Sequence, residues 1–239
     1  MKAGIFTTRI EKLTEMGVQE TRHFRLVFPP GTQFDFEPGQ FVNALAPSAE
    51  DPTKIIKRPY SIDSPPYEKG AIDLVWKRVE GGFMTNYLWK LKEGDSLQIQ
   101  GPLGRFNLKK PLPPHIVFVA TGTGIAPFRS MIFQLFKDGT DRQVWLIFGN
   151  RYDTDILYDE EWKKLAAGHS NFHYLPTVSR PKIWTGEKEY VQRVLEKNFR
   201  PSKDGHLYIC GLTKMINEVQ ETALRMGFTK DRIFFEKYD

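Results

Sequence analysis

The amino-acid sequence predicts two domains, an antiparallel β-barrel followed by an α/β domain with a doubly wound parallel sheet. Three observations lead to this fold class. Residues 4–108 form short stretches that mix polar and apolar side chains and stop at Gly or Pro turns, a pattern typical of antiparallel strands. From about residue 115, apolar stretches alternate with helical segments. The prolines of residues 109–114 make a short, stiff connector, so we place the domains at residues 1–110 and 111–239.

Turn residues separate the elements of the first domain. Strands are expected at residues 21–28, 40–45, 72–79 and 96–100. The last of these alternates strictly between polar and apolar side chains and stops at Gly101 and Pro102, as a half-buried strand does. Residues 85–91 are the exception, because a short helix is expected there.

The second domain opens with a different pattern. Residues 116–120 are a continuous apolar stretch, which indicates a strand buried on both faces. Further strands are expected at residues 144–148, 171–177, 206–210 and 233–235, and helices at residues 127–136, 159–167, 187–197 and 215–226. This alternation of strands and helices predicts the parallel, doubly wound sheet.

Length and hydrophobic pattern narrow the class of protein. The 239 residues, 40% of them hydrophobic, are enough for one large domain or two small ones. No stretch of 18 apolar residues exists, so no helix is expected to span a membrane. Residues 1–13 carry charges where a signal peptide needs an apolar stretch, so we expect a cytoplasmic location.

The cysteine count and the charge balance exclude further classes. Cys210 is the only cysteine, which excludes an internal disulfide, a cysteine-held iron–sulfur cluster and a zinc site of several cysteines; no metal site is expected. Lys and Arg number 34 against 29 Asp and Glu, a net charge of +5. This balance permits an acidic partner but does not require nucleic acid, and none is expected.

The strongest local motif lies in residues 120–127, which follow the apolar strand and open a helix. Glycine permits a positive φ and a close approach of a ligand, and a helix N-terminus offers free N–H groups to a phosphate. The spacing differs from G-x-G-x-x-G because Pro127 holds the place of the third glycine, and an ordinary strand-to-helix turn also explains two glycines. The candidate binding residues are Thr121, Gly122, Thr123, Gly124 and Pro127.

A second motif consists of Arg58, Tyr60 and Ser61. In a strand, Arg58 and Tyr60 share one face. An arginine can bind a phosphate through its planar fork, a tyrosine ring can lie against a flat aromatic ligand, and a serine hydroxyl can donate or accept a hydrogen bond. Taken alone, the motif also fits an ordinary edge strand with surface charge.

Two further motifs lie at the ends of expected elements. The glycines at 81 and 82 lead into a helix that Thr85 is expected to cap, which predicts a second anion-binding helix N-terminus or a plain cap. Cys210 and Gly211 end a central strand, where open α/β sheets bind ligands, although a free cysteine is commonly just a small buried hydrophobe. The candidate residues of the first of these motifs are Gly82, Phe83, Met84 and Thr85.

Taken in order, and together with residues 101–106, these motifs resemble the ferredoxin–NADP reductase family, whose members join a flavin barrel to a pyridine-nucleotide domain. The resemblance covers nearly the whole chain and implies FAD and NADP or NAD as cofactors. It implies that Arg58 and the amides of residues 82–85 hold the flavin phosphates. It also implies that Tyr60 packs on the isoalloxazine ring and that Ser61 lies near its reactive N5 atom.

The resemblance extends to the nucleotide and to the end of the chain. It implies that residues 122–127 hold the nucleotide pyrophosphate and that Cys210, next to Gly211, borders the nicotinamide. Residues 235–239 resemble an acidic–aromatic tail that relatives place near the flavin, so Glu236 is expected to orient the nicotinamide or relay a proton, and Tyr238 to contact the flavin. A frayed polar end is the alternative for this tail. The residues expected to act in catalysis are Ser61, Cys210 and Glu236.

The choice of nucleotide stays open at this point. Bacterial NADP-type relatives carry arginines at the places of Arg151 and Arg180, where they can grip a 2′-phosphate. They often carry a third arginine where this chain has Glu187, and an acid there would repel a phosphate. Residues 181–186 also resemble NADH-using relatives. The two arginines favour NADPH, and Glu187 favours NADH.

These observations predict a flavoenzyme that moves a hydride between NAD(P)H and FAD and then passes single electrons onward. Because this chain holds no cluster, the acceptor must be a separate protein, such as ferredoxin or flavodoxin, or a free molecule. One alternative is the NADH-dependent reductase component of an oxygenase or haem system. Another is a flavin-binding regulatory subunit without activity.

Overall fold

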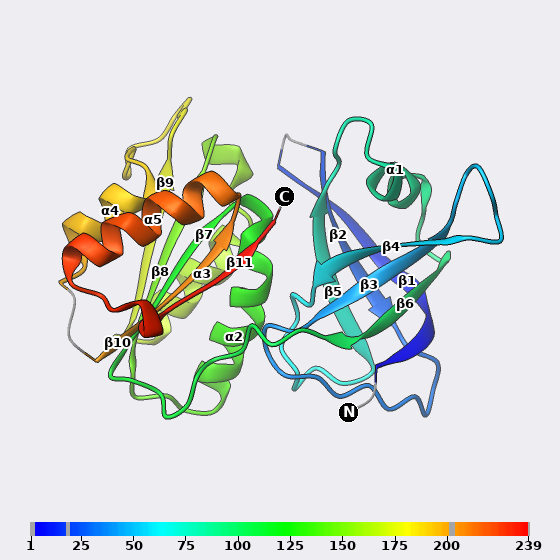
Figure 1. Cartoon of the computed structure of the whole chain (residues 1–239), viewed down its shortest axis with the longest axis horizontal. Coiled ribbons are helices and arrows are strands. Elements are labelled where there is room, and N and C mark those ends of the chain that lie inside the picture. The colour runs from blue at the N-terminus through cyan, green and yellow to red at the C-terminus, as the bar shows by residue number, and fades with distance from the viewer. Residues whose placement is uncertain (1–2, 18–19, 201–203, 239) are drawn as a thin grey trace. The chain divides into compact units, whose positions relative to one another are not determined.

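The computed structural model describes residues 3–17, 20–200 and 204–238. The chain divides into two units, one formed by residues 1–107 with residues 126–134 and the other by residues 108–125 with residues 135–239 (Figure 1). The domain boundary after residue 110 remains our proposal. Among the described residues, no helix has the length and apolar character needed to cross a membrane.

The first unit contains a six-stranded antiparallel sheet in the order β4-β3-β6-β1-β2-β5 (Figure 1). The backbone N–H of Asp63, just after β4, donates a hydrogen bond of 2.9 Å to the backbone oxygen of Asp73 in β5. The two outer strands are thereby joined, which confirms the predicted antiparallel, barrel-like sheet. The elements are β1 (Gly4–Met16), β2 (Thr21–Val27), β3 (Phe41–Pro47), β4 (Ile55–Ser61), β5 (Ala71–Lys77), α1 (Phe83–Lys90) and β6 (Ser96–Leu103).

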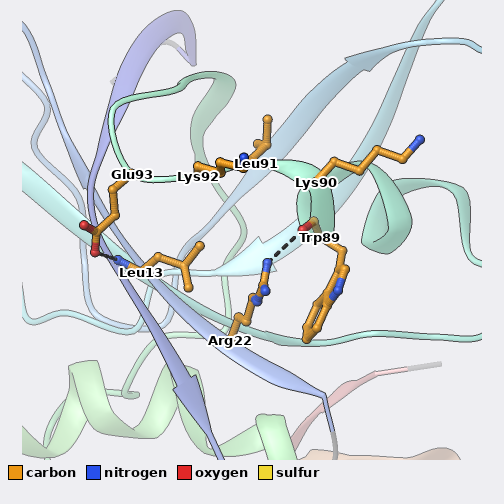
Figure 2. A pocket seen from close by; sticks show the side chains of 7 residues that line it. All are labelled: Leu13, Arg22, Trp89, Lys90, Leu91, Lys92 and Glu93. Carbon is orange, nitrogen blue, oxygen red and sulfur yellow. Dashed lines mark hydrogen bonds between the residues drawn. The ribbon is translucent and has the colours of Figure 1, made fainter.

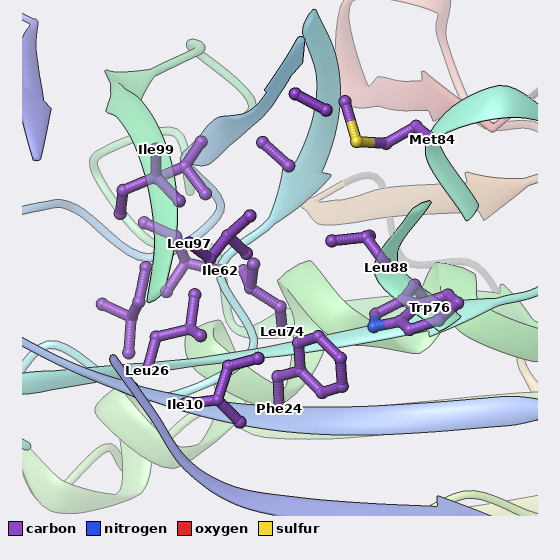
Figure 3. Close-up of a cluster of buried hydrophobic side chains, with 14 of the residues drawn as sticks. Ile10, Phe24, Leu26, Ile62, Leu74, Trp76, Met84, Leu88, Leu97 and Ile99 are labelled. Carbon is purple, nitrogen blue, oxygen red and sulfur yellow. The ribbon is translucent and has the colours of Figure 1, made fainter. Parts of the chain in front are cut away.

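Alternate side chains of these strands point into one hydrophobic core (Figure 3). Leu97 and Ile99 are fully buried while Gln98 between them is exposed, as the strict alternation of this strand predicts. The helix α1 adds Met84 and Leu88 to the same core. Each such apolar side chain contributes about 1.5–3 kcal/mol on burial, so the core and α1 are stabilised together.

Two elements of the first unit differ from what the sequence predicts. The longest strand, β1, was not recognised as a single element because its polar and apolar residues do not alternate evenly, and its pairing with β2 shifts register between Ile10 and Lys12. The helix α1 begins two residues earlier than predicted, and its N-cap residue is Gly82 rather than Thr85. The Thr85 hydroxyl instead accepts a hydrogen bond from the backbone N–H of Val79 at 3.1 Å.

The second unit contains a five-stranded sheet in the order β11-β10-β7-β8-β9, with all neighbouring strands parallel (Figure 1). The predicted doubly wound sheet is therefore confirmed. Its strands are β7 (His115–Thr121), β8 (Gln143–Asn150), β9 (Phe172–Val178), β10 (Gly205–Gly211) and β11 (Ile233–Lys237). Its helices are α3 (Asp159–Gly168), α4 (Val191–Asn198) and α5 (Thr213–Met226), with short 3₁₀ turns at η1 (Gly122–Ile125), η2 (Asp153–Asp155) and η3 (Lys230–Arg232). Helix α2 (Ala126–Lys137) follows η1, and its residues 126–134 are grouped with the first unit.

Helices cover both faces of this sheet. Val117 and Val119 of β7 belong to a buried cluster that also contains Val194 of α4 and Val219 of α5. On the opposite face Trp162 of α3 packs against Phe172 and Tyr174 of β9, with ring centroids 6.3 and 6.4 Å away. Both faces of the central strands are thus buried, which explains why their sequences read as continuous apolar stretches.

The helix predicted at residues 187–197 begins only at Val191. Before it, the backbone N–H of Val178 donates a hydrogen bond to the backbone oxygen of Glu187, and Glu187 forms an isolated parallel bridge with Thr177. Residues just before the helix therefore pair with the end of β9 instead of forming a helical turn. The tertiary pairing overrides the helical pattern that the sequence shows there.

Candidate active site

The loops after β7 and β10 meet at the carboxyl edge of the parallel sheet. These two strands are neighbours, and the strand order reverses between them. Open α/β sheets bind ligands outside the carboxyl ends of their strands at such a switch point. The 3₁₀ turn η1 follows β7, and Cys210 and Gly211 end β10. Two motifs that lie more than 80 residues apart in the sequence are therefore side by side in the structure.

Two glycines shape the loop after β7. Gly122 has a φ of +54°, and a Cβ built there would have no atom within 4 Å, so that side of the loop is open. Gly124 has a different role from the predicted positive φ. A Cβ on Gly124 would lie 2.7 Å from the carbonyl carbon of Cys210, so only glycine lets the two loops approach. Pro127 occupies the second position of α2, where its missing N–H has no cost.

Cys210 and Glu236 are directly paired in the register of β10 and β11. The Cys210 side chain is completely buried, and this burial raises the pKa of its thiol well above the usual value, with a further contribution from the negative charge of Glu236. The thiol is therefore neutral near pH 7. The backbone N–H of Tyr238 donates a hydrogen bond of 2.9 Å to the backbone oxygen of Gly211, which holds the chain end beside the same strand.

The two candidate phosphate-binding arginines follow β8 and β9. The backbone N–H of Arg180 donates a hydrogen bond of 2.7 Å to the backbone oxygen of Arg151. One residue earlier, the N–H of Ser179 donates to the oxygen of Asn150 at 3.0 Å. The structure thus brings Arg151 and Arg180 together at the carboxyl edge, and both side chains are exposed.

Glu187, which was expected to repel a phosphate, is held in an ion pair. The Lys197 ammonium lies 2.7 Å from Oε2 of Glu187, and the backbone N–H of Lys188 donates to Oε1 at 3.2 Å. The hydrogen bond from Lys197 is the main reason that the pKa of Glu187 is lowered. The negative charge of Glu187 is therefore compensated within the structure.

In the first unit, Arg58, Tyr60 and Ser61 all lie on β4. The exposed Arg58 guanidinium donates a hydrogen bond of 2.8 Å to the backbone oxygen of Lys57. Tyr60 is half-buried against the barrel core, and burial raises the pKa of its hydroxyl, while the charge of Arg58 acts in the opposite direction. Ser61 is only 4% exposed. The strand presents a charged group and a flat ring two residues apart, which fits the predicted contacts with a phosphate-bearing aromatic ligand.

The remaining residues predicted to contact the flavin lie at the N-terminus of α1. Gly82, its N-cap residue, gives the helix no side-chain cap, so the first-turn amides of residues 83–85 can serve a ligand. The Met84 side chain is buried in the barrel core, which leaves only the backbone of Met84 for binding. Phe83 is half-buried and also packs against that core. Both units therefore carry a glycine turn opening a helix, a donor set that fits phosphate-bearing cofactors.

Comparison with known proteins finds matches for both halves of the chain. Residues 9–108 match the oxidoreductase FAD-binding domain family, and residues 118–221 match the oxidoreductase NAD-binding domain family. Ferredoxin–NADP reductase B of Sorangium cellulosum is 37% identical over 217 residues, covering 87% of this chain and 88% of that protein. The chain belongs to the ferredoxin–NADP reductase family. It is an oxidoreductase whose cofactors are FAD and NADP or NAD.

Other relatives of this ferredoxin–NADP reductase family member serve different systems. The toluate 1,2-dioxygenase electron transfer component of Pseudomonas putida is 30% identical over 207 residues, and the match covers 86% of this chain but only 60% of that protein. The NADH-cytochrome b5 reductase-like protein of Arabidopsis thaliana is 30% identical over 234 residues, covering 90% of this chain and 71% of that protein. The chain thus spans less than two thirds of the dioxygenase component.

Solved structures show the same fold. A ferredoxin NADP+ reductase from Neisseria gonorrhoeae, described with bound FAD and NADP, superposes with a TM-score of 0.82 at 20% identity and 98% coverage of both chains. An Amycolatopsis cytochrome P450 reductase superposes with a TM-score of 0.87 at 23% identity, covering 98% of this chain and 70% of that one.

Sequence reasoning missed a buried cluster of titratable side chains that follows β4. Asp63, two residues after Ser61, is completely buried, and its Oδ2 lies 3.9 Å from Nε2 of His23. The same nitrogen lies 3.6 Å from Oδ2 of Asp73. Burial would raise the pKa of Asp73, but its hydrogen bond and charge interaction with His23, together with Arg25 and Arg129, lower it overall. His23 lies on β2 and Asp73 on β5, so their approach to Asp63 leaves no local pattern in the sequence.

Proposed function

We propose that this chain is an NADPH-dependent reductase that exchanges electrons with ferredoxin or flavodoxin. FAD, when bound, takes a hydride from the nucleotide and releases electrons singly, which a nicotinamide cannot readily do. The relative from Sorangium cellulosum, whose name states ferredoxin and NADP, supports this assignment at 37% identity. The structural argument comes from the two sets of binding residues.

The order of strands suits an extended dinucleotide. Going from β10 through β7 and β8 to β9, the carboxyl ends carry Cys210, the Gly122–Gly124 turn, Arg151 and Arg180. Neighbouring strands lie about 4.8 Å apart, so this row spans about 14 Å. We assign the nicotinamide to Cys210 and the pyrophosphate to the turn. The 2′-phosphate of NADPH then belongs to the two arginines.

The observation that carries the choice of NADPH is the pairing of Arg151 with Arg180 while Glu187 is engaged by Lys197. Two exposed guanidinium groups from adjacent strand ends can bind one phosphate through charge-assisted hydrogen bonds. The carboxylate that argued for NADH has its own cation at 2.7 Å. The balance of charge at this edge therefore favours a phosphate.

Each remaining residue has one assigned task. Amides of the turn and of the α2 N-terminus bind the pyrophosphate, and the neutral Cys210 thiol lines the nicotinamide position. Glu236 orients the carboxamide end of the nucleotide or holds a proton. In the first unit, Arg58 and the α1 amides bind flavin phosphates, Tyr60 contacts the ring, and Ser61 donates a hydrogen bond near N5. Tyr238, a residue of the second unit, is a further candidate contact for the flavin.

The test is a comparison of kcat/KM for NADPH and NADH with ferricyanide as acceptor, followed by reduction of purified ferredoxin and flavodoxin. We expect kcat/KM to be at least tenfold higher for NADPH than for NADH, which corresponds to about 1.4 kcal/mol. We also expect rapid reduction of at least one of the two proteins. A preference for NADH would contradict the nucleotide assignment and favour the alternative, a reductase component of an oxygenase or haem system. Failure with both proteins despite fast dye reduction would contradict the acceptor assignment alone.

A further inference from the structure

A pocket of about 420 Å³ lies at the C-terminal end of helix α1, on the side of the first unit where β1 and β2 form a hairpin (Figure 2). Arg22 of β2 is its central polar residue. Its side chain is only 13% exposed, and Figure 2 shows its guanidinium directed at the backbone oxygen of Trp89. The residues that line the pocket are Leu13, Arg22, Trp89, Lys90, Leu91, Lys92 and Glu93.

Arg22 binds the end of α1 in two ways. Nη1 donates a hydrogen bond of 2.8 Å to the backbone oxygen of Trp89, one of the last carbonyls of the helix. The guanidinium carbon lies 3.6 Å from the centre of the Trp89 ring. A cation at a helix C-terminus is stabilised by the helix dipole, and an arginine over a tryptophan ring gains a cation–π attraction.

Arg22 also has an ion-pair partner across the hairpin, the exposed Glu15. Nη2 lies 2.7 Å from Oε1 of Glu15, which is the direct cross-strand partner of Arg22 in the β1–β2 register. The Trp89 ring in turn meets the buried Trp76 of β5 edge to face, with centroids 6.0 Å apart. The end of α1 is therefore connected to two strands of the barrel through one arginine and one tryptophan.

The other end of α1 is the proposed binding site for the flavin pyrophosphate. The helix has eight residues, so its two ends are about 12 Å apart. A helix this short is not stable by its own hydrogen bonds, and its position depends on what holds it. Gly82 provides no side-chain cap at the N-terminus, whereas Arg22 binds the C-terminus.

We propose that Arg22 is a positioning residue for the flavin pyrophosphate, acting through α1 from its far end. This inference rests on the proposed flavin site at residues 82–85. When Arg22 binds the Trp89 carbonyl, the first-turn amides keep the place and direction in which they donate to the phosphates. Loss of Arg22 lets the helix shift, and the phosphates lose these donors while the ring-binding residues on β4 stay in place.

The experiment measures dissociation constants of FAD and of riboflavin, which has no phosphate, by flavin fluorescence on the full chain freed of flavin. Arg22→Met keeps an apolar stem over Trp89 but has no donor. We expect it to weaken FAD binding about tenfold, the range of one charge-assisted hydrogen bond, and to leave riboflavin binding unchanged. Arg22→Lys, which still offers one donor and one charge, should recover part of the FAD affinity.

Glu15→Gln is the matched control, since it removes the ion pair of Nη2 and leaves the bond to Trp89. It should leave the FAD-to-riboflavin ratio as in the parent protein. If Arg22→Met weakens both ligands equally, or neither, Arg22 has only a structural role and the inference is wrong. Arg22→Lys decides the matter in the same way if the methionine variant does not fold.

A separate pair of variants tests the flavin site itself. Phe83→Pro removes one first-turn amide at a position where proline is tolerated, because Gly82 has an extended backbone with ψ of 113°. Phe83→Ala loses the same ring but keeps the amide. A lower FAD affinity in the proline variant than in the alanine variant supports the proposed flavin site at residues 82–85. If that difference appears but Arg22→Met binds FAD like the parent protein, the proposed site is supported and the proposed role of Arg22 is wrong. If the two Phe83 variants bind FAD equally well, the proposed site is wrong.

Discussion

The backbone N–H of Arg180 and the backbone oxygen of Arg151 are joined by a hydrogen bond of 2.7 Å. This bond continues the pairing of β8 with β9 beyond their last residues. Two side chains 29 positions apart in the sequence therefore start from adjacent points on the carboxyl edge of the sheet. The distance between the backbones of Arg151 and Arg180 is therefore fixed by the sheet.

Replacing both arginines with alanine should affect the two nucleotides differently. We expect KM for NADPH to rise by about tenfold to hundredfold, the value of one or more charge-assisted hydrogen bonds, and KM for NADH to change little. The measurement is steady-state kinetics with ferricyanide, with Arg193→Ala in α4 as a control for loss of surface charge. Equal effects on both nucleotides would mean that these arginines contact the shared phosphates or only solvent.

The ion pair of Lys197 with Glu187 should also influence this choice. Lys197→Met leaves the carboxylate uncompensated, and we expect NADPH affinity to fall by about twofold at low salt, because two exposed like charges repel each other only weakly through water. Adding Glu187→Gln to that variant should restore the parent affinity. Arg193→Met removes the same charge from the same helix, where Arg193 pairs with Glu196, and should have no such effect. Titration with 2′,5′-ADP, with ADP as reference, measures the difference.

Replacement of Arg58 tests the flavin phosphate contact. Arg58→Ala removes one guanidinium from β4, and we expect FAD to bind about tenfold to hundredfold more weakly, from the loss of a charge-assisted hydrogen bond. Lys57→Ala, one residue earlier on the other face of the strand, should retain FAD as the parent does. Flavin content after gel filtration and fluorescence titration are the measurements. Retention of flavin by the Arg58 variant would place that residue on the free surface.

The buried thiol predicts a pH dependence of stability. Because burial raises the pKa of Cys210 above its value of about 9 in the unfolded chain, the folded state holds the thiol proton more tightly. Its contribution is therefore fully present below pH 9 and is lost as the pH rises through the folded-state pKa. Urea unfolding between pH 7 and 10.5 should show a steeper loss of stability in the parent than in Cys210→Ala. If the free energy of unfolding falls equally with pH in both proteins, ionisation of the Cys210 thiol does not destabilise the fold.

Salt should distinguish the classes of electron acceptor. Lys54 and Lys57 in one unit and Lys109 and Lys110 in the other are all exposed. Such charges steer an acidic protein, and the effect weakens as the screening length falls from about 10 Å at 0.1 M to about 3 Å at 1 M. We expect reduction of an acidic ferredoxin or flavodoxin to slow with added salt, and reduction of free flavin to change little. Salt-independent rates with both proteins, together with fast turnover of free flavin, would favour a diffusible-flavin reductase.

Most elements could be predicted because their signals are local. Leu97 and Ile99 alternate with polar neighbours, and residues 116–120 form an apolar run. The local pattern of each stretch therefore predicts which of its side chains are buried. The strand β1 had no such clear signal, because its register shift at Ile10 breaks the alternation. The predicted start of α4 at residue 187 was wrong because Glu187 pairs with β9. A helical pattern in the sequence cannot reveal such a pairing.

The order of motifs along the chain, read by itself, determined the family and the two cofactors and named the candidate residues, since a glycine turn that opens a helix offers free N–H groups to a phosphate. Only the tertiary structure decided which charges compensate each other. Glu187 meets Lys197, and Arg22 meets Trp89 from a position 67 residues away. These partners are chosen by strand order and helix packing, and a pair interaction of this kind leaves no pattern in either local sequence.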